Sequence, residues 1–330
     1  MATILEQITI SPLERLPELL MADECNLEAY LEEIVESAPL NNEVRVNAHF
    51  RFIRCGHSGL PMIKNLVGAM MDYVTQYAIE RCRHNRLDEC MSSQGYKMAA
   101  PKMNRLNYEA RKLFIERADR NGEGGEFLLY LLAERFLKIP QVLCKMPHKT
   151  NTEMHVHGTD GIHAKFDSES GKLAFYWCES KLYQSFNNAI DECFKSVAPF
   201  LCSEGAISST GGNDIRLFRD NISKNIDDQE LEDALLEYLD PEHTNYHNSE
   251  YRAICLVGFD EKNYPTEPNS EIAKNLKSIL AKKIDDWKEK ILGKLLEYNI
   301  HTFTIEIFCL PFPSVNDFRK EFSHILGGTS

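Results

Sequence analysis

The sequence lacks the long apolar run that a membrane-spanning helix requires. No stretch reaches the roughly 18 apolar residues needed to cross a bilayer, and the first residues show no charged-then-apolar secretion signal. The ten cysteines are scattered and include no Cys-x-x-Cys pair, so the sequence predicts neither disulfides nor a structural zinc site. Internal repeats and low-complexity segments are absent as well. These absences predict a cytoplasmic globular protein whose thiols are reduced and mostly buried.

Positive charge is also scarce. The 330 residues include 37 Lys and Arg against 50 Asp and Glu, which gives a net charge of −13. A free-standing nucleic-acid-binding protein normally carries a basic surface. A nucleic-acid enzyme of this composition therefore needs either a local basic patch or a partner that supplies most of the affinity for nucleic acid.

Four polar residues between positions 122 and 184 lie at the ends of apolar segments. Glu126 opens an apolar run that predicts a buried helix, and Asp160 precedes an alternating segment that is typical of a strand. Glu179 and Lys181 close a second apolar run. Because side chains alternate between the two faces of a strand, Glu179 and Lys181 are expected to share a face.

The spacing of these residues predicts a nuclease site. A turn at 167–171 would pair the two strands antiparallel and bring Asp160 beside Glu179, and an acid followed by Glu-x-Lys is the PD-(D/E)xK pattern. Phosphodiester hydrolysis uses a hard cation held by one or two carboxylates, which lowers the pKa of a bound water. We predict Asp160 and Glu179 as ligands of Mg²⁺ or Mn²⁺, with Glu126 as an additional acid and ligand. Lys181 is expected to contact the attacking water or the phosphate.

Histidines near Asp160 form a rival constellation. His155, His157 and His163, together with Asp160, could hold zinc or manganese, because His-x-His on a strand beside a carboxylate is a ligand pattern for these metals. This alternative leaves Glu126 and the Glu-x-Lys pair without a role. The histidines could instead line the same cleft or satisfy the ends of strands.

Other polar residues are weaker candidates. Gln184 follows the lysine strand and could lie near the site. Lys145 and Lys149 could reach a phosphate, although single lysines of this kind are expected to be exposed and solvated. A basic cluster contains Arg81, Arg83, His84 and Arg86. We interpret the cluster as the C-terminus of a helix, where the helix dipole favours cations, in preference to a contact with phosphate.

The remaining pattern predicts an α/β fold. We expect a restriction-endonuclease-like mixed sheet flanked by helices, with an N-terminal α/β extension at 1–110 packed on a nuclease domain at 111–330. A helical insertion is expected around 203–249. A strand, a crossover helix and a strand near the C-terminus predict a parallel pair. Helices are predicted at 13–21, 27–36, 62–81, 108–118, 126–139, 184–200, 272–296 and 315–326, and strands at 44–54, 141–146, 251–259 and 302–310.

Three segments carry a resemblance to a known family. The segments are Gly-Glu-Gly-Gly-Glu-Phe-Leu-Leu-Tyr from Gly122, His-Gly-Thr-Asp-Gly-Ile-His ending at His163, and Cys-Glu-Ser-Lys ending at Lys181. They resemble HamA, the nuclease subunit of the bacterial Hachiman anti-phage system. They are also similar to the nuclease domains of CBASS defence effectors. The resemblance runs from the strand near Val44 to the C-terminal helix, and the central stretch is its specific part. Thr159 occupies the position where nucleases of the PD-(D/E)xK superfamily often have proline.

The resemblance implies a metal-dependent DNase that works with a superfamily 2 helicase, HamB. The helicase is expected to restrain the nuclease and to release it on aberrant DNA, so that DNA in the infected cell is degraded. Two other functions stay open: a stand-alone restriction-type nuclease, and a non-catalytic scaffold subunit of a helicase complex. No sequence-recognition module is visible for the first, and the intact set of four polar residues disfavours the second.

Overall fold

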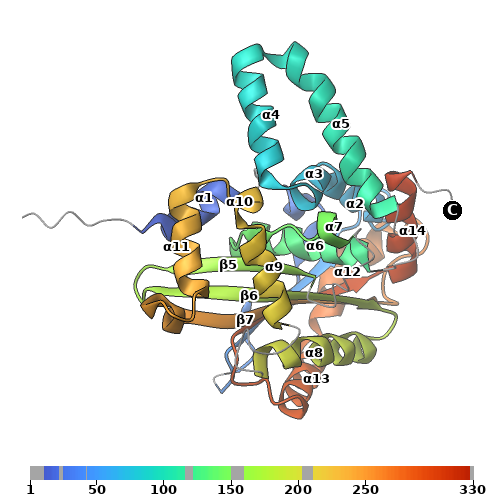
Figure 1. Cartoon of the computed structure of the whole chain (residues 1–330). Coiled ribbons are helices and arrows are strands. Elements are labelled where there is room, and N and C mark those ends of the chain that lie inside the picture. Colours follow the sequence, from blue (N-terminus) through green and yellow to red (C-terminus); the bar gives the residue numbers. More distant parts are fainter. Residues whose placement is uncertain are drawn as a thin grey trace, which may run out of the picture.

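The computed structural model describes residues 11–21, 25–41, 43–115, 122–149, 160–202 and 211–327. Within these residues, eight strands form a mixed sheet in the order β1-β3-β8-β7-β6-β5-β4, and β2 pairs with β3 (Figure 1). Strands β3, β8, β7 and β6 run parallel, whereas β5, β4, β1 and β2 pair antiparallel with their neighbours. The strands are β1 (Leu31–Glu33), β2 (Ala38–Pro39), β3 (Val46–Ile53), β4 (Gln141–Leu143), β5 (Gly161–Asp167), β6 (Lys172–Tyr183), β7 (Ser249–Asp260) and β8 (Ile305–Phe312).

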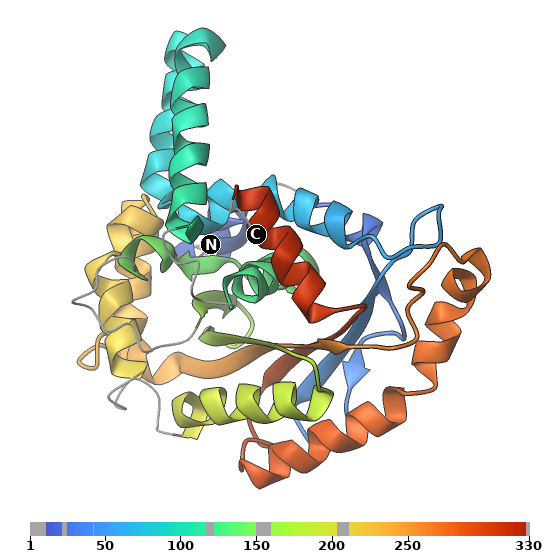
Figure 2. The same ribbon diagram turned by 90° about the vertical axis from the view of Figure 1, so that its right-hand side faces the viewer.

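Helices cover both faces of this sheet, which confirms the predicted α/β class. Helices α8 and α13 lie on one face, and α6 with α2 and α14 lies on the other (Figures 1 and 2). None of the described helices has the length and apolar character to cross a bilayer. The helices are α1 (Leu16–Leu20), α2 (Ile63–Met71), α3 (Val74–Ala78), α4 (Arg81–Gln94), α5 (Tyr96–Ile115), α6 (Glu123–Leu132), α7 (Met146–Lys149), α8 (Phe186–Cys202), α9 (Gly211–Asp220), α10 (Ile222–Asn225), α11 (Gln229–Leu239), α12 (Ser270–Ala281), α13 (Ile284–Glu297) and α14 (Val315–Leu326). Short helical turns are η1 (Pro12–Arg15), η2 (Leu27–Ala29), η3 (Ala133–Leu137) and η5 (Thr244–Asn248).

The central strands are buried on both faces. Strand β6 is apolar over most of its length, as expected for a strand with helices packed on either side. Trp177 and Phe175 are among the largest fully buried side chains, and Cys178, Cys193 and Cys255 are buried thiols in the same core. The predicted parallel pair near the C-terminus is β7 and β8. Strand β3 joins the same sheet through β8, so the N-terminal α/β part shares the sheet of the rest of the chain.

The hairpin of β5 and β6 has the predicted register. Gly161 pairs with Cys178 and Asp167 pairs with Lys172, in an antiparallel ladder. Gly171 closes the turn with φ of 65°, a left-handed conformation that glycine adopts without steric cost. This hairpin therefore brings the residue before β5 next to the polar end of β6.

Several predicted helix boundaries are wrong. The helix expected at 27–36 is instead η2 followed by β1, because β1 pairs antiparallel with β3 and Arg51 and Arg54 form ion pairs with Glu33 and Glu32. This tertiary pairing outweighs the local helical pattern. The predicted helix at 62–81 is broken into α2 and α3, and the one at 272–296 into α12 and α13. The strand expected at 141–146 ends at Leu143, where the edge position in the sheet gives it only one partner.

The preferred interpretation of the basic cluster is also wrong. The cluster of Arg81, Arg83, His84 and Arg86 lies at the start of helix α4 and not at the end of a helix. Ile79 and Glu80 adopt extended ψ angles, so α3 ends there and α4 begins at the next residue. The helix dipole therefore does not favour these cations. Helix α5 begins at Tyr96, earlier than the expected 108, and it packs against α4 as an antiparallel hairpin. This hairpin projects away from the sheet in both views (Figures 1 and 2).

Gly258 of β7 lies opposite Leu182 of β6 in the parallel pair. A Cβ atom there would overlap the side chain of Leu182 and approach Phe312 Cε2 to 2.9 Å. We expect Gly258→Ala to lower the free energy of unfolding by about 1–3 kcal/mol, the usual cost of overpacking a core. Urea unfolding measures this change.

Gly293 on α13 provides the matched control. A Cβ there meets nothing within 4 Å, so Gly293→Ala should raise the free energy of unfolding by roughly 0.5–1 kcal/mol through helix propensity. A Gly258→Ala protein as stable as wild type would show that Leu182 can move without cost.

Candidate active site

Asp160 is held against the end of β6. Its backbone N–H donates to the carbonyl of Cys178 at 2.8 Å, and its Oδ2 accepts the backbone N–H of Ser180 at 2.7 Å. The carboxylate thus lies next to residue 179, as the antiparallel hairpin predicted. The negative charge of Asp160 also acts on Lys181, whose pKa it helps to raise.

Glu179 and Lys181 form an ion pair on one face of β6. Lys181 Nζ donates to Glu179 Oε1, and the Glu179 side chain is only 6% exposed. Burial raises the pKa of Glu179, against the opposing effects of Lys181 and of a hydrogen bond from Ser196. Burial lowers the pKa of Lys181, but Glu179 and Asp160 outweigh it and the pKa ends above its usual value. Lys181 is therefore protonated at neutral pH, in contact with a buried carboxylate.

Glu126 lies in the first turn of α6, within electrostatic range of this pair. The hydroxyl of the buried Tyr77 donates to Glu126 Oε2 at 3.5 Å. Burial, followed by the charges of Glu126 and Asp160, raises the pKa of Tyr77. The charge of Glu126 also contributes to the raised pKa of Glu179. The structure thus brings the four predicted residues into one electrostatic cluster.

Helix α6 reaches this cluster from the other face of the sheet. A Cβ on Gly125 would lie 3.0 Å from Ser180 Oγ and 3.1 Å from Leu182 Cγ, two side chains that alternate with Glu179 and Lys181 along β6. The absence of a side chain at Gly125 lets the helix begin in contact with the strand. Glu126, the next residue of α6, lies close enough for its charge to raise the pKa of Glu179.

The described residues contain no ready-made set of three His, Cys, Asp or Glu side chains arranged to hold a metal ion. A magnesium site needs fewer protein ligands, because Mg²⁺ keeps several waters and is held by one or two carboxylates. The neighbouring carboxylates of Asp160 and Glu179 fit that requirement in ligand type and number. These two residues could hold such a cation.

The rival histidine constellation is only partly covered by the structure. His155 and His157 lie outside the described residues. His163 is 1% exposed and its Nδ1 donates to the carbonyl of Ile139 at 2.8 Å. Burial lowers the pKa of His163 to about 4. It pairs with Tyr176, so its side chain lies on the face of the sheet opposite Glu179.

Comparison of the sequence with protein-family models identifies the family. A family model described as HamA matches residues 28–326. The chain belongs to the HamA family. No curated protein matches the chain. Membership in this family points to a protein of the Hachiman defence system, as the three sequence segments implied.

Two features of this HamA-family chain were not expected. Lys145 was predicted to be an exposed lysine, but this is wrong: it is 2% exposed, and its charge partly offsets the burial that raises the pKa of Cys178. The apolar residues on either side of Lys145 did not by themselves predict its burial, because a single lysine usually indicates an exposed side chain. Tyr77, which contacts Glu126, lies far from the site in sequence, and no pattern in the sequence indicated this contact.

Of the two remaining candidates, the structure describes the side chain of Gln184 only. Gln184 is exposed just beyond the end of β6, where its backbone carbonyl accepts the N–H of Asp260 at 3.3 Å. The side chain of Lys149 lies outside the described residues.

Proposed function

We propose that this HamA-family protein is a metal-dependent DNA nuclease of a bacterial anti-phage system. The observation that carries the proposal is the juxtaposition of the tethered Asp160 carboxylate with the buried ion pair of Glu179 and Lys181. Two carboxylates and one ammonium at the end of a strand pair are the groups that a PD-(D/E)xK reaction uses. Glu126 adds a further negative charge from α6.

Each residue has a distinct part in the proposed hydrolysis of a phosphodiester bond. Asp160 and Glu179 would hold Mg²⁺ or Mn²⁺, and Glu126 is a third acid of the set. A cation bound there would lower the pKa of a bound water and offset charge on the scissile phosphate. Lys181, kept protonated by the two carboxylates, donates to the attacking water or to the phosphate oxygen, in a site with little solvent to compete.

Control by a HamB-like superfamily 2 helicase is the second part of the proposal. A chain with net charge −13 binds DNA weakly over most of its surface, so a partner that delivers DNA also determines when cleavage occurs. The N-terminal segment and the helical insertion are the places where we expect the helicase to bind. They lie side by side, since Arg15 forms an ion pair with Asp228 at 3.0 Å and η1 packs on α11.

Plasmid degradation tests the proposal directly. The purified chain is incubated with plasmid DNA, alone and with its helicase, in Mg²⁺ or in EDTA. We expect DNA loss that requires Mg²⁺ and falls by about 10²–10³-fold in Lys181→Ala, the usual effect of removing one electrostatic donor from an active site.

Lys172→Ala is the matched control on the same strand. Lys172 is a half-exposed lysine whose ion pair is with Glu250, at the far end of β6, so its removal should leave cleavage unchanged. Cleavage by Lys181→Ala at the wild-type rate would reject the site assignment. If no condition gives cleavage, the scaffold alternative is favoured instead.

A further inference from the structure

The projecting hairpin of α4 and α5 has the opposite charge to the rest of the chain. Residues 81–115 contain eight Lys and Arg against three Asp and Glu, a net charge of +5, whereas the whole chain carries −13. The remainder therefore carries −18. The hairpin therefore supplies a local positive surface on an otherwise acidic chain.

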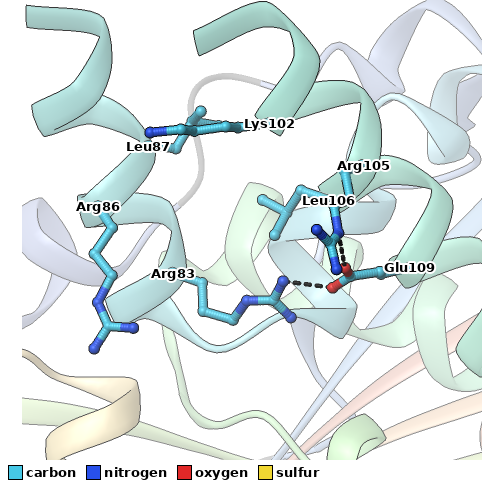
Figure 3. A pocket seen from close by; sticks show the side chains of 7 residues that line it. All are labelled: Arg83, Arg86, Leu87, Lys102, Arg105, Leu106 and Glu109. Atoms are coloured by element: carbon cyan, nitrogen blue, oxygen red, sulfur yellow. Dashed lines mark hydrogen bonds and ion pairs between the residues drawn. The ribbon is translucent and has the colours of Figure 1, made fainter. Parts of the chain in front are cut away.

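The basic side chains line a pocket between the two helices. The cavity has a volume of about 290 Å³ and is lined by Arg83, Arg86, Leu87, Lys102, Arg105, Leu106 and Glu109. Figure 3 shows Arg83 and Arg105 converging on Glu109, while Arg86 and Lys102 extend from the two facing helices. Four cationic side chains and a single carboxylate thus line the pocket.

Glu109 leaves most of this positive charge unbalanced. It pairs with Arg83, and Arg105 Nε donates to its Oε1 at 3.0 Å. Arg86 has no hydrogen bond or ion pair among the described residues, and Lys102 Nζ contacts only the Cys90 thiol, at 3.1 Å. The pocket therefore presents unused N–H donors to an anion. Planar guanidinium groups match the oxygen geometry of phosphate particularly well.

A second cavity continues from this pocket toward the body of the protein. It has a volume of about 320 Å³, shares Arg83 and Glu109 with the first, and extends past Lys112 and Ile79 to Pro147. Ile79 lies two residues after Tyr77, whose hydroxyl contacts Glu126 of the polar cluster. The two cavities form one groove whose excess positive charge lies at the hairpin end, because Glu80 and Glu109 balance Arg83 and Lys112 in the second cavity. A groove of this extent fits a polymer of phosphates better than a single anion.

We infer that the α4–α5 hairpin is an arm that binds the sugar–phosphate backbone of DNA and presents it to the site at the end of β6. The inference rests on the proposed nuclease function for the identity of the polymer. Phosphate contacts position a nucleic acid without reading its sequence, which suits a protein with no recognition module. The arm also accounts for how an acidic chain holds a polyanion.

The test measures DNA affinity separately from cleavage. Fluorescence anisotropy of a labelled duplex oligonucleotide is recorded in EDTA at several salt concentrations, for wild type and for Arg86→Gln/Arg105→Gln. Both side chains are exposed, so the fold is expected to be unaffected. We expect about tenfold weaker binding and a salt dependence, log K against log [salt], reduced by about 2, because each lost phosphate contact contributes about 0.9.

Lys274→Gln/Lys282→Gln is the charge-matched control, since both lysines are exposed on or beside α12, outside the hairpin. Equal DNA affinity in the arginine variant and this control would overturn the inference. So would an arginine variant that keeps DNA binding but loses binding of ATP, which would assign the pocket to a free nucleotide. Loss of DNA binding in the arginine variant would support the role of the hairpin in DNA binding. If wild type also failed to cleave DNA in Mg²⁺, the proposed nuclease activity would be refuted while the role of the hairpin would stand.

Discussion

Replacing Glu179 with glutamine should reduce DNA cleavage by about a thousandfold while leaving the fold intact. The substitution removes a proposed metal ligand and the carboxylate that pairs with Lys181. Burial already disfavours the charged form of Glu179, so a neutral side chain of the same shape costs little in stability. Initial rates of plasmid cleavage measure the loss, and urea unfolding of the same preparation checks the fold.

Glu250→Gln is the control for this prediction. Glu250 is also a glutamate with cationic partners, Lys172 and Arg252, but it lies at the opposite end of the sheet from Asp160. Its removal should leave the cleavage rate within about twofold of wild type, as expected for a surface ion pair remote from a reaction. Wild-type cleavage by Glu179→Gln would exclude Glu179 from the reaction and leave the histidine constellation as the alternative.

Trp177→Ala should lower the free energy of unfolding by about 3–5 kcal/mol, the range for truncating a large buried aromatic residue. Trp177 is fully buried two residues before Glu179 on the same strand. Its ring packs against Phe200 of α8, at 5.5 Å between ring centroids, and is stacked almost parallel to Tyr251 of β7 at 6.2 Å. Removing the indole leaves a cavity between the sheet and α8 that these neighbours cannot fill. Urea or thermal unfolding followed by circular dichroism measures the change.

Tyr183→Ala provides the comparison on the same strand. Tyr183 ends β6 with 38% of its surface exposed, so its truncation should change the free energy of unfolding by about 0.5 kcal/mol or less. A Trp177→Ala protein that unfolds within 1 kcal/mol of wild type would contradict the packing argument, in which case β6 and α8 must close the cavity by moving together.

The local pattern of apolar and polar residues predicted the part of the site that lies on the β5–β6 hairpin. The alternation along β5 and β6 and the polar turn with Gly171 are sufficient to set an antiparallel register, and this register places Asp160 beside Glu179. The same period of two places Lys181 on the face of Glu179. These three residues could therefore be placed together before any tertiary contact was known.

Contacts between distant segments could not be predicted in the same way. The segment at 27–36 has a helical pattern, yet its pairing with β3 makes it a strand. Lys145 is buried because β4 and α7 place it in the interior, and a single lysine in a sequence usually indicates an exposed side chain. Tyr77 reaches Glu126 only because α3 packs near α6.

The sequence by itself determined the α/β class, the hairpin of β5 and β6, and the set of Asp160, Glu179 and Lys181, because hydrophobic periodicity and turn residues act over a few neighbouring positions. Only the tertiary structure decided that Glu126 approaches from the opposite face of the sheet and that the basic cluster begins a helix. The basic residues of α4 and those of α5 are separated in the sequence. They line one pocket only because the two helices pack against each other.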